Sequence, residues 1–172
     1  MEVILLRHPT ETDWMECKRR ALVTIGKEAK IPPSLDWKRK MLKSRHSPIR
    51  YLQFSFYLKG IPSWVATHLV RHVHAQPYVK SQRNDRQSEY DRNAARQDSP
   101  VDMIWDMNAE EFLTICNKRL CMKASKETRM VVQMMCDCVG KANFEFLPFM
   151  VPNCKYLNGC PEFEPCNRAN SW

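Results

Sequence analysis

The order of apolar and polar positions divides the chain into short strand-like and helix-like stretches. Residues 1–6 (MEVILL) are almost continuously apolar and predict a first strand. Thr10 is a good helix cap, and the apolar spacing after it predicts a helix that reaches Leu22. In the same way, Ser34 caps a second predicted helix, over residues 37–43. The N-terminal part therefore favours one strand followed by two helices.

The middle of the chain predicts a further strand, a helix and a loop. Residues 49–58 (IRYLQFSFYL) are β-branched or aromatic and partly alternate, which is typical of a strand. Gly60 and Pro62 interrupt this stretch, and Pro62 suits the first turn of a helix running toward His72. Residues 75–100 are polar and irregular, so we expect a basic loop there, longer than a simple connection needs.

Two helical patterns follow, and together the elements indicate a fold class. Apolar spacing predicts helices over residues 108–121 and 125–139. We expect an α+β fold in which a mostly antiparallel sheet packs against helices. A chain of 172 residues is long enough for one domain. We therefore assign residues 1–150 to the main domain and the cysteine-rich residues 151–172 to a C-terminal tail.

Composition narrows the class of protein. Hydrophobic residues make up 44% and charged residues 27%, as in globular domains. No apolar run approaches the roughly 20 residues of a membrane span, and the start is a poor signal peptide, so we expect a cytoplasmic protein without a membrane partner. Four glycines leave no room for a glycine-rich phosphate loop, which excludes Rossmann and P-loop sites. A net charge of +8 indicates an anionic partner, either a nucleic acid or a nucleotide phosphate.

Eight cysteines raise the question of disulfides or a metal. Nothing marks the chain as secreted, so we interpret them as reduced thiols. Cys154, Cys160 and Cys166 have five residues between successive members, and Cys136 and Cys138 precede them. Structural zinc sites usually pair cysteines about two to four residues apart. Scattered thiols are therefore the favoured interpretation, and a structural zinc is the alternative.

The densest group of chemically active side chains lies in residues 67–83 (THLVRHVHAQPYVKSQR). On a helix, His68 and His72 would share one face, as two ligands of a metal do, but no glutamate lies between them. A solvated basic face is a second interpretation. The third, which we favour, is that Arg71, His72 and the following Ser81 bind phosphate or the electron-rich edge of a flavin.

A specific arrangement of motifs surrounds this segment. After Arg71-His72 and position 73, seven residues (74–80) intervene before Ser81, and Arg83 follows two residues later. Further motifs lie around it in a fixed order: Ser47-Pro48, Phe54-Ser55-Phe56, Ala95-Arg96 with Pro100, Trp105, Asn108-Ala109 and Arg119. Over residues 44–130, this order resembles the flavin-dependent thymidylate synthases.

The resemblance implies a flavoenzyme that transfers one carbon from methylenetetrahydrofolate to carbon 5 of dUMP, with FAD as cofactor, NADPH as reductant and a homotetramer as the assembly. It implies that Ser47, Arg71, His72 and Asn108 bind the flavin, and that His68, Ser81, Gln82, Arg83, Arg96 and Arg119 bind the nucleotide. Arg119 would be the catalytic residue, because a guanidinium stays charged and can stabilise a developing enolate-like oxygen. The resemblance assigns no residue to a metal, and nucleic acid is not an expected partner.

The departures from the family pattern lie on the substrate side. Val73 replaces the last arginine of the signature, and Tyr78-Val79 replaces an Asn-Glu pair. His68 stands where a glutamine is expected, and only twelve residues separate Arg83 from Arg96. These changes leave two alternatives open. One is a folate-dependent hydroxymethyltransferase that makes a 5-hydroxymethyl pyrimidine nucleotide. The other, of a different class, is a basic zinc-containing nucleic-acid-binding module.

Overall fold

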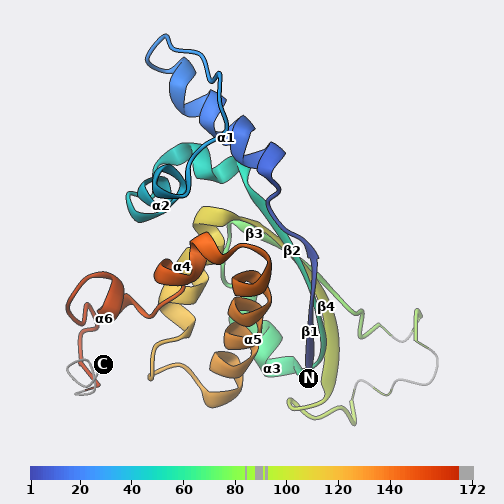
Figure 1. The fold of residues 1–172 in the computed structure, drawn as a ribbon. Helices are drawn as coiled ribbons and strands as arrows, with labels where there is room; N and C mark the ends of the chain where they lie inside the picture. Colours follow the sequence, from blue (N-terminus) through green and yellow to red (C-terminus); the bar gives the residue numbers. More distant parts are fainter. Residues whose placement is uncertain (84, 88–90, 92, 167–172) are drawn as a thin grey trace.

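A computed structural model describes residues 1–83, 85–87, 91 and 93–166 of the chain (Figure 1). Its elements follow in the order β1 (Glu2–Arg7), α1 (Glu11–Val23), α2 (Leu35–Lys43), the 3-10 helix η1 (Ser47–Tyr51), β2 (Gln53–Pro62), α3 (Ser63–Leu69), β3 (Ala75–Val79), β4 (Pro100–Asn108), α4 (Ala109–Arg119), α5 (Lys126–Ala142), the 3-10 helix η2 (Phe144–Phe149) and α6 (Asn153–Tyr156). Among these helices, none is long and apolar enough to cross a membrane.

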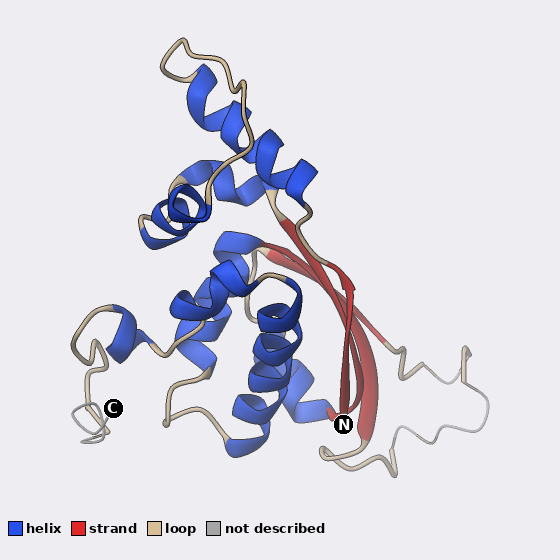
Figure 2. Ribbon diagram, viewed as in Figure 1, coloured by secondary structure: helices blue, strands red, loops and turns tan. Residues whose placement is uncertain are grey.

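The strands form one four-stranded antiparallel sheet in the order β1-β2-β4-β3. Alternation sends every second side chain of the central strands to one face, where they are buried: Phe54, Phe56, Leu58, Val101, Met103, Trp105 and Met107. Helices α3, α4 and α5 pack against this face, and Figure 2 shows them on one side of the sheet. The expected α+β fold with an antiparallel sheet is confirmed.

The sequence patterns do not predict strands β3 and β4. Strand β3 lies inside the segment expected to be a loop, so the connection shortens to residues 80–99, part of which lies outside the described residues. In β4, the buried residues alternate with Asp102, Ile104 and Asp106. Because aspartate is disfavoured in strands, the alternation does not predict a strand from the sequence. The strand forms because β2 pairs with one of its edges and β3 with the other.

Strand β2 begins and ends later than expected. The predicted strand residues 49–51 belong to η1, which starts at Ser47 and contains Pro48 at a position where a missing N–H does no harm. At its far end, the strand continues through Gly60, where the register with β4 shifts. Gly60 adopts a φ of +60°, and its N–H donates to Asp102 Oδ1 over 2.8 Å. A side chain would be strained at this φ, so glycine permits the bulge that leads β2 into α3.

The helix starts are predicted well, because their signals are local. Thr10 caps α1 by accepting from the backbone N–H of Asp13, and Asp13 returns a hydrogen bond to the Thr10 backbone. Ser34 caps α2 in the same position relative to Trp37. The predicted starts of α4 and α5 are also found, each with a capping side chain at its N-cap.

A buried polar contact connects α1 to η2. Trp14 is fully buried and packs against Phe146 with 5.9 Å between the ring centroids. Its Nε1 donates to Glu145 Oε1 over 2.7 Å, and Asn143 Nδ2 donates to the same oxygen over 3.3 Å. Glu145 is only 4% exposed, so water cannot easily replace it as the acceptor for these two donors.

We expect Glu145→Ala to lower the free energy of unfolding by about 2 kcal/mol, because it leaves the buried Trp14 Nε1–H without an acceptor, whereas Asn143 Nδ2 keeps the Pro9 carbonyl. Glu145→Gln retains an oxygen acceptor and is the matched control, with a smaller loss. Denaturant titration followed by tryptophan fluorescence measures both. Equal losses in the two variants would contradict the role given to this acceptor.

Candidate functional site

Helix α4 carries two of the predicted site residues, Asn108 at its N-cap and Arg119 at its end, on one face. Asn108, Glu111, Ile115 and Arg119 follow one another at intervals of three or four residues, so they project from the same side. Asn108 is the N-cap: its Oδ1 accepts from the backbone N–H of Glu111 over 2.9 Å. Arg119 is the last residue of the helix. At about 1.5 Å per residue, Asn108 and Arg119 begin about 16 Å apart along the helix axis.

His72 lies beside this face and not on a helix. Helix α3 ends at Leu69, earlier than expected, so His68 and His72 do not form the helical pair of a metal site. A turn holds His72 instead: its N–H donates to the Leu69 carbonyl, and its own carbonyl accepts from Ala75 N–H, each over 3.1 Å. The side chain is buried under α4. Histidine and helix therefore meet through tertiary packing.

The buried imidazole connects a carboxylate to Arg119. His72 Nδ1 lies 3.3 Å from Glu111 Oε1, and Arg119 Nε lies 3.0 Å from His72 Nε2. A guanidinium nitrogen can only donate, so His72 Nε2 accepts from it. The ring proton is consequently placed on Nδ1, facing the carboxylate. The hydrogen bond from Arg119 to His72, with Glu111 close to the other ring nitrogen, fixes the direction of the guanidinium.

Arg119 is also held by backbone. Its Nη2 donates to the His68 carbonyl over 2.8 Å. Burial lowers the pKa of Arg119, and the charge of the nearby Arg71 lowers it further. Arginine starts from so high a pKa that Arg119 remains cationic. Two positive charges thus lie close together, which favours an anionic or electron-rich ligand between or beside them.

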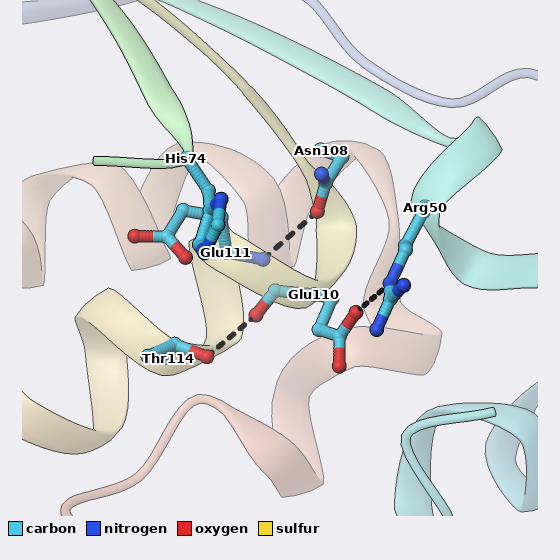
Figure 3. Close-up of a pocket in the computed structure, with 6 residues that line it drawn as sticks. All are labelled: Arg50, His74, Asn108, Glu110, Glu111 and Thr114. Atoms are coloured by element: carbon cyan, nitrogen blue, oxygen red, sulfur yellow. Dashed lines mark hydrogen bonds and ion pairs between the residues drawn. The ribbon is translucent and has the colours of Figure 1, made fainter. Parts of the chain in front are cut away.

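A pocket of about 340 Å³ opens at the N-terminus of α4. Figure 3 shows the residues that line it: Arg50, His74, Asn108, Glu110, Glu111 and Thr114. The 3-10 helix η1 is fixed here because Ala109 N–H donates to the Leu52 carbonyl over 2.8 Å. This contact places Arg50 beside the helix, where it pairs with Glu110. Glu111 is shared between this pocket and the histidine–arginine pair.

The remaining expected nucleotide-binding residues lie elsewhere. Ser81, Gln82, Arg83 and Arg96 follow β3 or precede β4. The described parts of this connection extend from the end of the sheet opposite to Asn108, after Val79 and before Pro100 (Figure 1). Arg83 forms a two-bond ion pair with Asp85, and Arg96 forms one with Asp98. Ser81 Oγ accepts from the Arg83 N–H over 3.3 Å.

Gln82, His68 and Ser47 occupy three further places. Gln82 lines a separate pocket of about 270 Å³ over α3, together with Lys80 and Thr67. The ring of His68 packs edge-on against Trp64, with 5.4 Å between centroids. Ser47 is exposed at the start of η1. Within one chain, the structure thus brings Arg71, His72 and Arg119 together and leaves Arg83 and Arg96 apart from them.

Sequence reasoning missed three residues of the site. Arg50, His74 and Glu111 had no role in the predicted set, yet all line the α4 pocket. For Glu111, a signal was present: it lies eight residues before Arg119, two helical turns along the same face. Arg50 and His74 reach the pocket only through the packing of η1 and the turn after α3, which no local pattern encodes.

Comparison with known proteins adds a fold assignment. No protein-family model matches the sequence, and no curated protein matches it. The structure resembles a flavin-dependent thymidylate synthase from Helicobacter pylori crystallised with FAD and dUMP, at a TM-score of 0.67 and 16% identity over 87% of this chain and 99% of that one. It also resembles a UMP/dUMP methylase from Streptomyces cacaoi bound with 5-Br dUMP, at a TM-score of 0.66 and 15% identity over 87% and 96% of the chains.

The chain has the flavin-dependent thymidylate synthase fold. The similarity extends over nearly the whole length of the solved structures. Because a fold does not determine a reaction, the chemistry depends on the side chains of the α4 face and of the residues beside it.

We expect Asn108→Ala to lower the free energy of unfolding by about 1 kcal/mol, because α4 loses its N-cap acceptor. Asn108→Ser keeps a capping oxygen and is expected to stay near wild type. Chemical denaturation followed by circular dichroism distinguishes them. If both variants lost the same stability, capping would not be the structural role of this residue.

Proposed function

We propose that this protein is a flavin-dependent enzyme that transfers one carbon from methylenetetrahydrofolate to carbon 5 of dUMP, giving dTMP. The observation that carries the proposal is the contact of the buried His72 with Glu111 on one side and with the half-buried Arg119 on the other. These contacts hold in place two residues, His72 and Arg119, that the sequence resemblance selects. The fold supports the same reading, because two solved proteins that share it were crystallised with FAD and dUMP or with 5-Br dUMP.

The residues at the N-terminus of α4 fit a flavin. Arg50, His74 and the Asn108 side chain supply a cation, an imidazole and an amide around one pocket of about 340 Å³. Such donors suit the carbonyl and nitrogen edge of a flavin or its phosphates. Ser47, at the start of η1, and Arg71 and His72, at the turn after α3, complete the proposed set. Bound FAD supplies the hydride chemistry, recharged by NADPH, while these residues bind and orient it.

Arg119 is the residue proposed to act on the pyrimidine. Its guanidinium would face a ring carbonyl, stabilise negative charge on that oxygen and so favour loss of the N3 proton. His72 Nε2 and the His68 carbonyl each take one of its N–H groups, so the direction of the remaining donors is fixed before substrate arrives. Such preorganisation removes the cost of reorienting dipoles during the reaction.

The nucleotide phosphate is proposed to bind Arg83 and Arg96, with Ser81 and Gln82 beside it. Both arginines are exposed and paired with carboxylates, so a phosphate would replace Asp85 and Asp98 as their partner. Exposed ion pairs of this kind contribute only about 0–1 kcal/mol, so the exchange costs little. Because these residues lie at the end of β4 opposite to Asn108 and the α4 pocket, we propose that a second copy of the chain completes each site, in a homotetramer.

One observation favours a second candidate product, a 5-hydroxymethyl pyrimidine nucleotide. Val73 is 82% exposed at the position where the family signature has an arginine. The missing cation would lie next to Arg71 and His72, near the flavin or the nucleotide of the proposed site. A weaker hold on the reduced flavin would favour release of a 5-hydroxymethyl nucleotide, formed by addition of water instead of hydride to the same one-carbon unit. The hydroxymethyltransferase is therefore the alternative product class.

The test is an incubation of the purified protein with dUMP, methylenetetrahydrofolate, FAD and NADPH, followed by mass measurement of the nucleotide. We expect dTMP, formed only with NADPH, and a flavin absorption spectrum in the purified protein. A hydroxymethylated product formed without NADPH selects the alternative. Absence of flavin together with salt-sensitive binding to DNA or RNA would overturn the proposal in favour of a nucleic-acid-binding module.

We expect Arg119→Ala to lower turnover by at least about a hundredfold while flavin remains bound, because it removes a charge that acts on the pyrimidine and not on the cofactor. The matched control is Lys118→Ala, which removes an exposed cation from the adjacent position of the same helix. Steady-state assays and flavin absorption measure the two effects. Wild-type turnover in Arg119→Ala would refute its role.

Mixing two inactive variants tests whether two copies share a site. Arg119→Ala and Arg96→Ala are co-expressed, each with a different affinity tag, and the mixed oligomer is purified. If each site takes these two arginines from different copies, random assembly restores about a quarter of wild-type activity. If a single copy supplies both, the mixed oligomer stays inactive, which would refute the shared site without affecting the proposed reaction.

A further inference from the structure

The structure divides the eight cysteines into two groups. Four of them are committed to the core of the domain or its edge. Cys17 is fully buried, and burial raises its pKa to about 12. Cys116 and Cys136 face each other across α4 and α5 with 3.5 Å between their sulfurs. Cys138 Sγ lies 3.7 Å from the Val3 carbonyl. These thiols pack as small hydrophobes, and the sequence hypothesis that Cys136 and Cys138 join the tail cysteines is not supported by their positions.

The other four cysteines line a single cavity. Cys121 comes from the turn after α4, Cys154 from α6, and Cys160 and Cys166 from the segment that follows. Cys121 is far from the others in sequence, and only the fold brings it to them. The cavity has a volume of about 20 Å³. That is room for about one water molecule or one metal ion.

The chemistry of the walls suits a soft cation better than a water. Besides Asn153 and Glu162, the remaining lining is Leu120, Met122 and two prolines, so a water here would find few hydrogen-bond partners. Four cysteine sulfurs are the ligand set of the commonest structural zinc sites, in which the metal is four-coordinate. Cysteine sulfur is a soft ligand, so this set does not suit calcium or magnesium, which require oxygen ligands.

Few contacts fix the position of the tail: Tyr156 Oη donates to the Lys43 carbonyl over 3.0 Å, and the Arg45 guanidinium lies over the Tyr156 ring. Helix α6 has four residues and none of them is buried. Leu157 and Phe163 expose 55% and 101% of their side chains. A turn at Asn158, which has a φ of +54°, and a hydrogen bond from Gly159 N–H to the Cys154 carbonyl bring the chain back after α6. A segment with so little buried surface gains most from a metal that links it to the domain.

We propose that Cys121, Cys154, Cys160 and Cys166 bind one zinc ion as thiolates and thereby attach the C-terminal tail to the turn between α4 and α5. Within the described residues, no three potential ligands are close enough to hold a metal as they stand. Binding therefore includes a closing step: cysteine χ1 angles change between staggered positions and the tail tightens around the ion. Each thiol gives its proton to solvent, and Zn²⁺ takes the place of the four protons.

The experiment measures metal in the full-length protein expressed in zinc-supplemented medium. We expect one zinc per chain by elemental mass spectrometry. Cys121→Ser and Cys160→Ser are each expected to lower the zinc content at least tenfold, since each removes one thiolate ligand. Cys138→Ser is the matched control, because this half-buried cysteine lies outside the cavity, and it should keep its zinc. Circular dichroism confirms that the variants remain folded.

A second measurement does not depend on the variants. Replacing zinc by cobalt(II) in the wild-type protein should give the strong visible absorption of tetrahedral coordination and a sulfur-to-metal charge-transfer band. Zinc absent from the wild type, zinc retained in both ligand variants, or a cobalt spectrum without sulfur coordination would each overturn the proposal. A disulfide between any two of the four cysteines, seen as a mass two hydrogens lower, would overturn it as well.

Discussion

Asn108 belongs to two elements at once, and the candidate site depends on this junction. It is the last residue of β4, where it pairs with Gln53 of β2, and it is also the N-cap of α4. Because no loop intervenes, the sheet itself sets the direction of the helix. The next residue, Ala109, is held by the Leu52 carbonyl, which fixes η1 to the same point. The α4 face, its pocket and Arg50 are therefore positioned by one short stretch of backbone.

Carboxylates hold most of the cations proposed to bind substrate or cofactor. Arg50 pairs with Glu110, Arg83 with Asp85 and Arg96 with Asp98, whereas Arg119 is held by an imidazole and a carbonyl. The exposed pairs are weak and can be exchanged for a phosphate. The buried set around Arg119 is different, since breaking it would leave polar groups without partners. Ligand binding is thus expected to rearrange the exposed arginines and to leave Arg119 where it is.

Local signals account for what the sequence predicts, and long-range packing accounts for what it does not. The caps at Thr10 and Ser34 act within a few residues, so they are readable from the sequence. Strand β4 carries aspartates on its open face, and only pairing on both edges makes it a strand. For the site, the motif spacing selected His72 and Arg119, which the structure joins. The contribution of Glu111 and the separation of Arg96 depend on tertiary geometry that no motif records.

Helix α4 is a rigid spacer between the two ends of the candidate site. Asn108 and Arg119 are its first and last anchors, about 16 Å apart along the axis. A compound the size of a pyrimidine ring can reach one anchor but not both. An inhibitor that contacts both residues must therefore be long. The length of the linker between its two binding groups is set by the length of helix α4. Shortening or lengthening α4 by a single residue would rotate Arg119 by about 100° and defeat such a compound.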